Sequence, residues 1–281
     1  MKEIKSNYRF TLFLQIIQLL MIPAIIIIRF VIYIPDDVIN IGSLILAYYY
    51  GYLIFYKQYN VKIKEKLKIK NKNILTFIYD IISGIFIIMV YSNILRIIYQ
   101  LLGYSGDGEV NLVLTPLYIV EICIIAPIIE EIIFRGFAYN TLKSKGKVFA
   151  IIMSSFLFAL FHYNYVQFAS TLCLGLVLCS LDEKYDSILP GIVLHIINNM
   201  IATGIFGYLN DDITRIVLYI IIFILVIIYF INNFKGKKLK IIENIKEIFR
   251  LSSKSLSFYL VVLINIILFV LQYLGIIEGL Y

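Results

Sequence analysis

The stretch APIIEEIIFRG, residues 126–136, places two adjacent glutamates and an arginine in an otherwise apolar part of the chain. Ionisable side chains inside a membrane span are costly and mark functional sites. Glu131 and Arg135 are four residues apart on one helical face, with the acid first, which favours an ion pair. Glu130 then points about a hundred degrees away and is free to act. The alternative is that these charges only mark the interfacial end of the span.

The composition around this stretch excludes a soluble domain. Hydrophobic residues make up 61% of the 281 residues, charged residues 15%, and the mean hydropathy is +0.91. We therefore predict an all-α fold, a polytopic bundle of about eight or nine transmembrane helices, with the active site within the membrane. Nine apolar stretches qualify as spans, and one of them could be re-entrant: 10–34, 38–56, 74–102, 112–134, 148–163, 166–181, 188–206, 213–231 and 256–274.

Charges in the loops alternate along the chain and predict the orientation. The N-terminus, the loop 57–72, the loop 135–147 and the segment 235–254 are basic, whereas residues 36–37, 107–109 and 211–212 are acidic. Lys and Arg in short loops lie on the cytoplasmic side. We expect a multi-pass protein of the cell membrane with a cytoplasmic N-terminus and basic loops that contact anionic lipid. The net charge of +7 thus needs no nucleic-acid partner.

The chain has only two histidines, each in its own apolar segment after the glutamate pair. In FALFHY, residues 158–163, Phe158 lies one turn before His162 and could pack against its imidazole. In PGIVLHIINN, residues 190–199, His195 and Asn199 face the same direction and Asn198 points elsewhere. Singly, each histidine is best interpreted as a hydrogen-bonded core residue, and Asn199 as an interhelical anchor.

Considered together, the three segments favour a shared site. At about 1.5 Å per helical residue, Glu130, His162 and His195 reach similar depths from the loops that flank their spans. They could therefore meet in one polar cavity near mid-membrane.

These residues also resemble the motifs of a known family. Glu130, Glu131 and Arg135 match EExxxR, Phe158 and His162 match FxxxH, and His195 and Asn199 match HxxxN. In this order, on consecutive apolar helices, they resemble the CPBP family, the intramembrane proteases related to the type 2 CAAX prenyl endopeptidase. The bacterial members, called Abi proteins, are linked to bacteriocin processing and self-immunity. The resemblance divides the chain into N-terminal helices with a basic loop (1–111), a catalytic core (112–206) and C-terminal helices (207–281).

The resemblance implies an intramembrane endopeptidase and a role for each motif residue. Glu130 would be the general base on water, and Glu131 would be held by Arg135. His162 and His195 would position the water or bind a metal, and Asn199 would support the oxyanion or His195. A metal held by Glu130, His162 and His195 would be a divalent ion, with zinc favoured by this ligand set. A metal-free glutamate and histidine mechanism is the alternative.

The substrate expected for such an enzyme is a membrane protein or a leader-bearing peptide. Two other functions use the same residues. A small transporter would use them as a proton or ion pathway, but the other spans carry few ionisable groups besides Asp80 and Arg96. A non-catalytic immunity or scaffolding protein would keep the fold for binding, which the complete set of motif residues disfavours.

Overall fold

The computed structural model describes residues 2–31, short stretches between 38 and 53, 63–69, 73–102, 115–203, 224, 250 and 252–276. In these parts all regular elements are helices, which confirms the all-α prediction. The elements are α1 (Lys2–Val31), α3 (Ile63–Lys66), α4 (Ile74–Leu101), α5 (Pro116–Val120), η1 (Glu121–Ile125), α6 (Ala126–Glu131), η2 (Ile132–Tyr139), α7 (Asn140–Leu142), η3 (Lys143–Lys145), α8 (Lys147–Leu160), α9 (Tyr165–Tyr185), α10 (Leu189–Ala202) and α13 (Leu256–Tyr273).

Among the described residues, three helices are long and apolar enough to cross a membrane, namely α4, α9 and α13. The helices α8 and α10 have 14 residues each, fewer than the roughly 20 that a full span needs. About half of the predicted span 38–56, and all of 213–231 except Ile224, lie outside the described residues. A membrane protein is therefore supported, and the count of eight or nine spans stays a prediction.

Several helix ends differ from the ends of the predicted spans. The first span was predicted to start at Phe10, but α1 begins at Lys2, because Lys and Arg are good helix formers and do not end a helix. Helix α9 likewise runs to Tyr185, beyond its predicted end at Leu181. Helix α8 ends at Leu160, so His162 lies in the turn after it and not on the helix.

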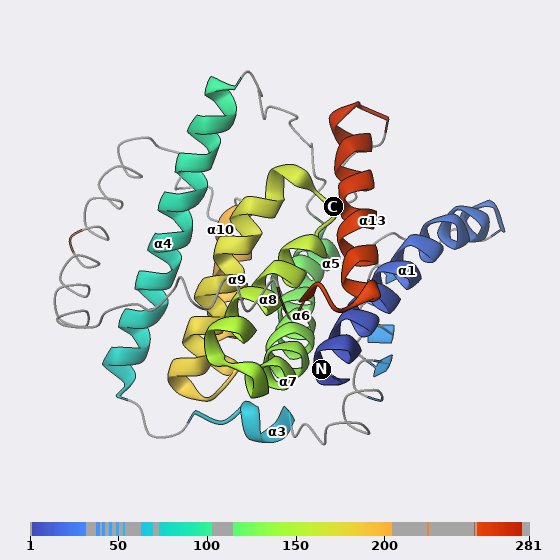
Figure 1. Ribbon diagram of the computed structural model, residues 1–281. Coiled ribbons are helices and arrows are strands. Elements are labelled where there is room, and N and C mark those ends of the chain that lie inside the picture. Colours follow the sequence, from blue (N-terminus) through green and yellow to red (C-terminus); the bar gives the residue numbers. More distant parts are fainter. Residues whose placement is uncertain are drawn as a thin grey trace.

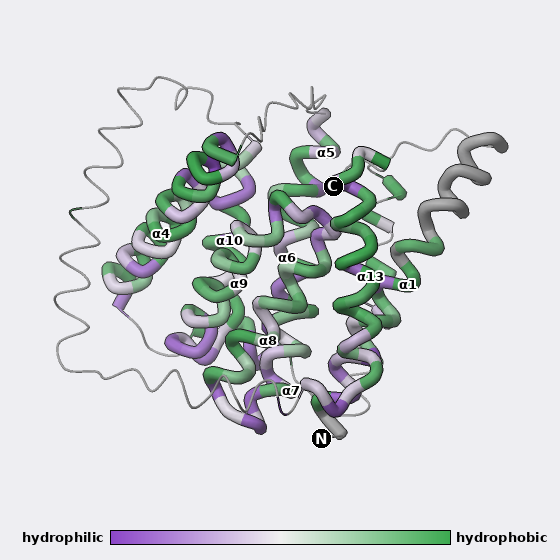
Figure 2. Tube along the Cα trace, turned by 45° about the horizontal axis from the view of Figure 1, so that its top comes forward, coloured by the Kyte–Doolittle hydropathy of each residue, from purple (hydrophilic) through white to green (hydrophobic). Residues whose placement is uncertain are grey.

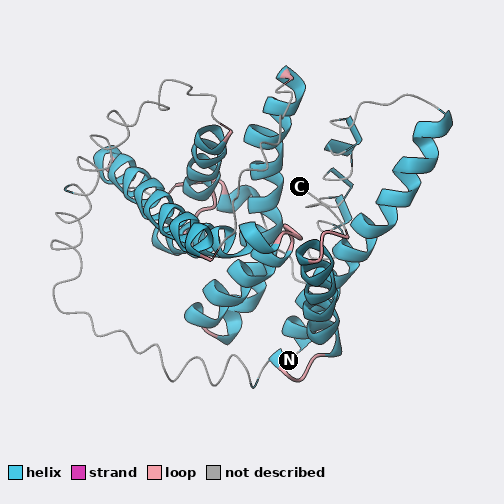
Figure 3. Ribbon diagram, turned by 90° about the horizontal axis from the view of Figure 1, so that it is seen from above, coloured by secondary structure: helices cyan, strands magenta, loops and turns pink. Residues whose placement is uncertain are grey.

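The helices form a central group flanked on two sides (Figure 1). The segment from α5 to α7 and helices α8, α9 and α10 form the centre, α4 flanks it on one side, and α1 with α13 flank it on the other. The hydropathy colouring in Figure 2 shows green along much of these helices, and the view from above in Figure 3 shows α4 and α1 at opposite edges. The outer face of α13 exposes Leu263, Ile266 and Val270, as expected for a surface in contact with lipid.

Residues 116–142 form one helical segment in which two π-helical stretches interrupt the α-helix. The π-helical turns of η1 precede α6, and those of η2 follow it. Pro127 sits at the start of α6, where its missing N–H removes one backbone hydrogen bond from the helix. Wide π turns change the direction of the side chains that follow, and they are frequent at functional sites.

Helices α8 and α9 approach each other closely at Gly175. A Cβ atom on Gly175 would lie 2.9 Å from Ser155 Cβ and 3.0 Å from Ser155 Cα, so only glycine fits. Small residues let helix backbones approach in this way. The close packing that results stabilises helix association in lipid, where the hydrophobic effect between helices is absent. This contact brings the carbonyl of Gly175 next to Arg135.

Ion pairs tie the loops together at one end of the bundle. Glu183 at the end of α9 pairs with Lys143 and Lys147 and accepts a hydrogen bond from Tyr139. Asp80 on α4 pairs with Lys184, and Lys66 on α3 pairs with Asp186. In Figure 1 the N-terminus, α3 and α7 all lie at this end.

The Gly175 contact predicts a difference between two glycine substitutions. Gly175→Ala should lower the free energy of unfolding by about 1–3 kcal/mol, because the new methyl group meets the backbone of α8. Gly84→Ala should cost less, since its Cβ would meet the movable Cδ1 of Leu194. Unfolding of both variants in detergent micelles measures the difference, and equal losses would contradict the rigid contact.

Candidate active site

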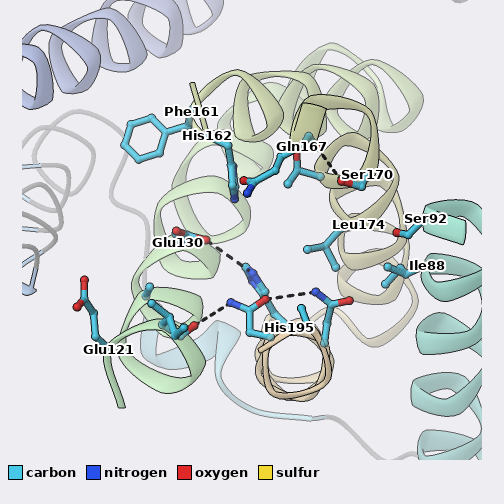
Figure 4. A pocket seen from close by; sticks show the side chains of 16 residues that line it. Ile88, Ser92, Glu121, Glu130, Phe161, His162, Gln167, Ser170, Leu174 and His195 are labelled. Carbon is cyan, nitrogen blue, oxygen red and sulfur yellow. Dashed lines mark hydrogen bonds and ion pairs between the residues drawn. The ribbon is translucent and has the colours of Figure 1, made fainter. Parts of the chain in front are cut away.

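A cavity of about 420 Å³ lies between α4, α6, α9 and α10 (Figure 4). Glu130 enters it from α6, His162 from the turn after α8, and His195 from α10. Helix α4 contributes Ile88 and Ser92, and α9 contributes residues between Gln167 and Leu174. The three separate segments therefore do meet in one polar cavity, as their predicted depths indicated.

Beneath the cavity, Glu131 holds two partners with one oxygen. Its Oε1 lies 3.1 Å from Arg135 Nη1 and accepts a hydrogen bond from His195 Nδ1 at 2.9 Å. The side chains of Glu131 and Arg135 are fully buried, and that of His195 is nearly so. Arg135 Nη2 also donates to the carbonyl of Gly175 at 3.4 Å. The predicted i, i+4 ion pair is present, and it extends to α9 and α10.

Phe158 is the apolar centre of this arrangement. The guanidinium carbon of Arg135 lies 4.3 Å from the centroid of its ring, within range of a cation–π interaction. The rings of His162 and His195 both meet it edge to face, with centroids 4.8 Å and 5.7 Å away. The prediction that Phe158 packs against the His162 imidazole is correct. One buried aromatic ring thus fixes three of the motif side chains.

His162 is oriented by backbone contacts in its turn. Its Nδ1 lies 3.0 Å from the carbonyl of Phe158, and a carbonyl only accepts, so Nδ1 carries the proton. The next residue, Tyr163, has a left-handed backbone with φ 49°, an uncommon conformation for a bulky residue. Gln272 of α13 donates to the Tyr163 carbonyl and accepts from the Tyr165 backbone N–H. Helix α13 therefore holds the turn that presents His162.

Glu130 and His195 face each other across the cavity without a hydrogen bond. The Oε2 atom of Glu130 lies 3.7 Å from His195 Nε2, and the Glu130 side chain keeps 15% of its surface exposed. Nδ1 of His195 donates to Glu131, and the neutral imidazole then carries a lone pair on Nε2. In that form both facing atoms are acceptors, and one water in the adjoining cavity can donate to both.

Asn199 is anchored more firmly than predicted. Its Nδ2 donates to the carbonyl of Ile122 in η1 at 2.8 Å, and its Oδ1 accepts from Asn198 Nδ2 at 3.2 Å. The prediction that Asn198 points elsewhere was wrong, because both amides line the cavity. The interhelical-anchor interpretation of Asn199 describes this geometry, and one N–H of its amide remains for another acceptor.

The donor atoms fit a metal in chemistry but not in spacing. Both histidines carry the proton on Nδ1, which leaves Nε2 available, and Glu131 supports His195 as carboxylates often support metal-bound histidines. However, in the part of the chain that the structure describes, no three His, Cys, Asp or Glu side chains lie close enough to hold a metal ion.

The comparison with protein families agrees with these residues. Residues 112–201 match the family described as type II CAAX prenyl endopeptidase Rce1-like. This segment is a CPBP-family domain. The match spans about a third of the chain, and the family consists of intramembrane proteases. Comparisons with curated proteins and with solved structures gave no match. All six candidate site residues of the CPBP domain lie within the matched segment.

One buried acid next to the site was not anticipated. Asp182 lies just beyond the predicted span 166–181, but α9 extends through it and leaves its side chain only 4% exposed. The charges in residues 182–186 indicated a loop end, and no local pattern distinguished Asp182 from Glu183. Only the packing of α9 against α10 shows that Asp182 is buried and Glu183 is not.

The buried ion pair predicts that the loss of one partner costs more stability than the loss of both. Arg135→Met should destabilise the protein by about 3–5 kcal/mol, because it leaves Glu131 charged, buried and without a cation. Adding Glu131→Gln to this variant should recover part of the loss. Unfolding of both single variants and the double variant measures the coupling. Strict additivity of the two losses would show that the pair is not coupled.

Proposed function

We propose that this protein is an intramembrane endopeptidase that hydrolyses a peptide bond of a membrane protein or a leader-bearing peptide. The observation that carries the proposal is the gap between Glu130 Oε2 and His195 Nε2 inside the cavity. Membership of residues 112–201 in an intramembrane protease family supports the same chemistry.

The gap suits a water molecule that attacks a peptide carbonyl. A water there donates one O–H to the Glu130 carboxylate and the other to the lone pair of His195 Nε2. Glu131 fixes the proton of His195 on the far nitrogen, so the near nitrogen stays an acceptor. His162, with its own proton on Nδ1, presents the same kind of acceptor from the other wall.

In the reaction, Glu130 first takes a proton and later returns it. Glu130 takes a proton from the water as its oxygen bonds to the carbonyl carbon, which gives a tetrahedral oxyanion. Side-chain amide N–H groups of Asn198 and Asn199, which line the cavity, stabilise this charge. Glu130 returns the proton to the amine nitrogen as the C–N bond breaks. The products are a carboxylic acid, which then loses its proton to solvent, and an amine.

A divalent metal at Glu130, His162 and His195, zinc before others, remains a second hypothesis for activating the water. It requires these side chains to move from their present positions into a tighter cluster, because no such cluster exists among the described residues. The cleavage assay with chelator-treated and zinc-restored samples tests for this metal.

The two rival functions, a transporter and an immunity or scaffolding protein, depend on other features of the structure. A transporter needs ionisable groups along a path, whereas Asp80 is already paired with Lys184 near one end of the bundle. An immunity or scaffolding role, which bacterial members of this family suggest, needs no pre-formed water site. Neither rival explains two histidines that line the cavity and whose Nδ1 atoms are both held by acceptors.

We further propose that the N-terminus and the basic loops are cytoplasmic and contact anionic lipid. The N-terminus, α3 and α7 lie at one end of the bundle, and Lys66, Lys143 and Lys147 are paired there with acids of α9. The described parts of three basic segments predicted to share one side of the membrane, the N-terminus and the loops 57–72 and 135–147, therefore lie at the same end of the bundle. Most of the fourth segment, 235–254, lies outside the described residues.

Glu130→Gln should abolish cleavage, because the amide keeps the size of the side chain but cannot take a proton from water. The measurement is cleavage of a library of membrane peptides by purified full-length protein in liposomes, read by mass spectrometry. We expect a loss of at least about 100-fold, the range for removing a general base.

Glu65→Gln on α3 is the matched control, since it is the same chemical change at an exposed position. A Glu130→Gln protein as active as wild type would refute the assigned base. Chelator-treated and zinc-restored samples belong to the same assay. Loss with recovery on zinc assigns a metal to the site, and full activity in chelator assigns the metal-free route.

The orientation is tested by labelling single cysteines in a background where Cys123, Cys173 and Cys179 are replaced by serine. Lys145→Cys in η3 and Leu102→Cys at the end of α4 lie at exposed positions. A membrane-impermeant maleimide should label position 102 in intact cells and position 145 only after permeabilisation. The reverse pattern would overturn the cytoplasmic placement of the N-terminus.

A further inference from the structure

One wall of the cavity is polar, although none of its residues carries a step of the proposed reaction. Gln167, Ser170 and Thr171 line the cavity from the first two turns of α9. Their spacings of three and four residues place them on one face of the helix, and we call this face the α9 wall. In a membrane protein, hydrogen-bonding groups at such a wall need partners inside the protein or in a ligand.

The two hydroxyl groups of the α9 wall donate their protons within the helix. Ser170 Oγ donates to the carbonyl of Gln167 at 2.8 Å, and Thr171 Oγ1 donates to the same carbonyl at 2.9 Å. A hydroxyl has one proton, so both oxygens present only lone pairs to the cavity. The N–H donors that this wall offers to a ligand are therefore those of the Gln167 side-chain amide.

Gln167 is the third residue of α9, where a glutamine commonly bonds back to the backbone N–H of the N-cap residue. The N-cap Asn164 accepts a hydrogen bond from the Gln167 backbone N–H at 3.2 Å. In the part of the chain that the structure describes, the Gln167 side chain makes neither the return bond nor any other. Figure 4 shows this side chain pointing into the cavity. Its two N–H donors and its carbonyl acceptor are therefore available to a bound molecule.

The ligand whose chemistry matches this amide is a peptide group. In a helical substrate each carbonyl is bonded to an N–H four residues further on, so a stretch that opens for hydrolysis loses these bonds. Within a membrane no water replaces them. The carboxamide of Gln167 donates and accepts in one plane, and it can therefore replace both bonds of one peptide group.

The other residues around the cavity favour a neutral peptide over a charged lipid headgroup. Among the described lining residues the acidic ones are Glu121 and Glu130, and none is Lys or Arg. An anionic headgroup would therefore find no opposite charge there. Ile88 of α4 and Leu174 of α9 also line the cavity and provide apolar contacts for aliphatic side chains of a peptide.

We propose that the α9 wall is a substrate subsite that binds the backbone of a peptide in extended form. Gln167 pairs with one peptide group close to the bond that is hydrolysed, and the oxygens of Ser170 and Thr171 accept from further N–H groups. The identity of the ligand as a peptide rests on the proposed function.

Binding is measured on Glu130→Gln protein, which keeps the cavity but should not cleave. Full-length protein in liposomes is incubated with the library of membrane peptides, and mass spectrometry identifies the peptide that is retained best. Adding Gln167→Met, which keeps the length of the side chain without its hydrogen-bonding groups, should raise the Kd of this peptide about 10-fold, the range for losing one or two hydrogen bonds. Gln100→Met, at an exposed position near the end of α4, is the matched control and should leave the Kd unchanged.

Ester replacements in the bound peptide distinguish a direct bond from an indirect effect on the cavity. Each amide of the peptide is replaced in turn by an ester, which removes one N–H group. At one position the ester should weaken binding to Glu130→Gln protein, and this loss should disappear once Gln167→Met is also present. Additive losses at every position would overturn the proposal, as would an unchanged Kd in the Gln167→Met protein.

Cleavage and binding separate this inference from the proposed function. If wild type cleaves nothing while Glu130→Gln protein binds a peptide through Gln167, the proposed function fails and the subsite stands. If wild type cleaves, Gln167→Met should lower kcat/KM about 10-fold, because it removes binding energy from the transition state. An unchanged kcat/KM would leave the protease in place and refute the subsite. Retention of no library peptide by the Glu130→Gln protein would also refute the subsite.

Discussion

The ion pair between Glu131 and Arg135 is fully buried, and the structure around the cavity is arranged to compensate it. A carboxylate and a guanidinium removed from water lose several kcal/mol of hydration each, which their mutual attraction recovers only with added hydrogen bonds. Here those come from His195 of α10 and from the backbone of Gly175 in α9, and Phe158 of α8 covers the cation. Helices α8, α9 and α10 thus all contact this one ion pair. Such a pair adds little net stability, but it restricts how the helices can be placed.

The same requirement explains the small residues nearby. Gly175 lets α9 approach α8 closely enough for its carbonyl to reach Arg135, and Gly191 leaves the space in which Glu131 and Asp182 face each other. In lipid, where no water replaces a missing partner, every such group must find its partner inside the protein. The site therefore depends on residues that carry no chemistry of their own.

Burial also separates the roles of the two adjacent glutamates. Glu131 is enclosed and bound on one oxygen by two cationic or N–H groups, whereas Glu130 borders the cavity and keeps part of its surface exposed. One residue of helical rotation places one acid in a structural network and the other against the space where a water and a peptide fit. The π turns on either side of α6 set the direction of both.

The sequence by itself determined the helical class, the ion pair between Glu131 and Arg135, the contact of Phe158 with His162, and the meeting of three polar segments. The first three follow from composition and from spacings of four residues along the chain, which are local properties. The fourth follows from the similar depths of the three segments in their spans. Only the tertiary structure decided that Asn198 joins Asn199 in the cavity, that His162 stands in a turn held by α13, and that Asp182 is buried while Glu183 is not. Each of these depends on contacts between residues far apart in the chain, whose distances no local spacing encodes.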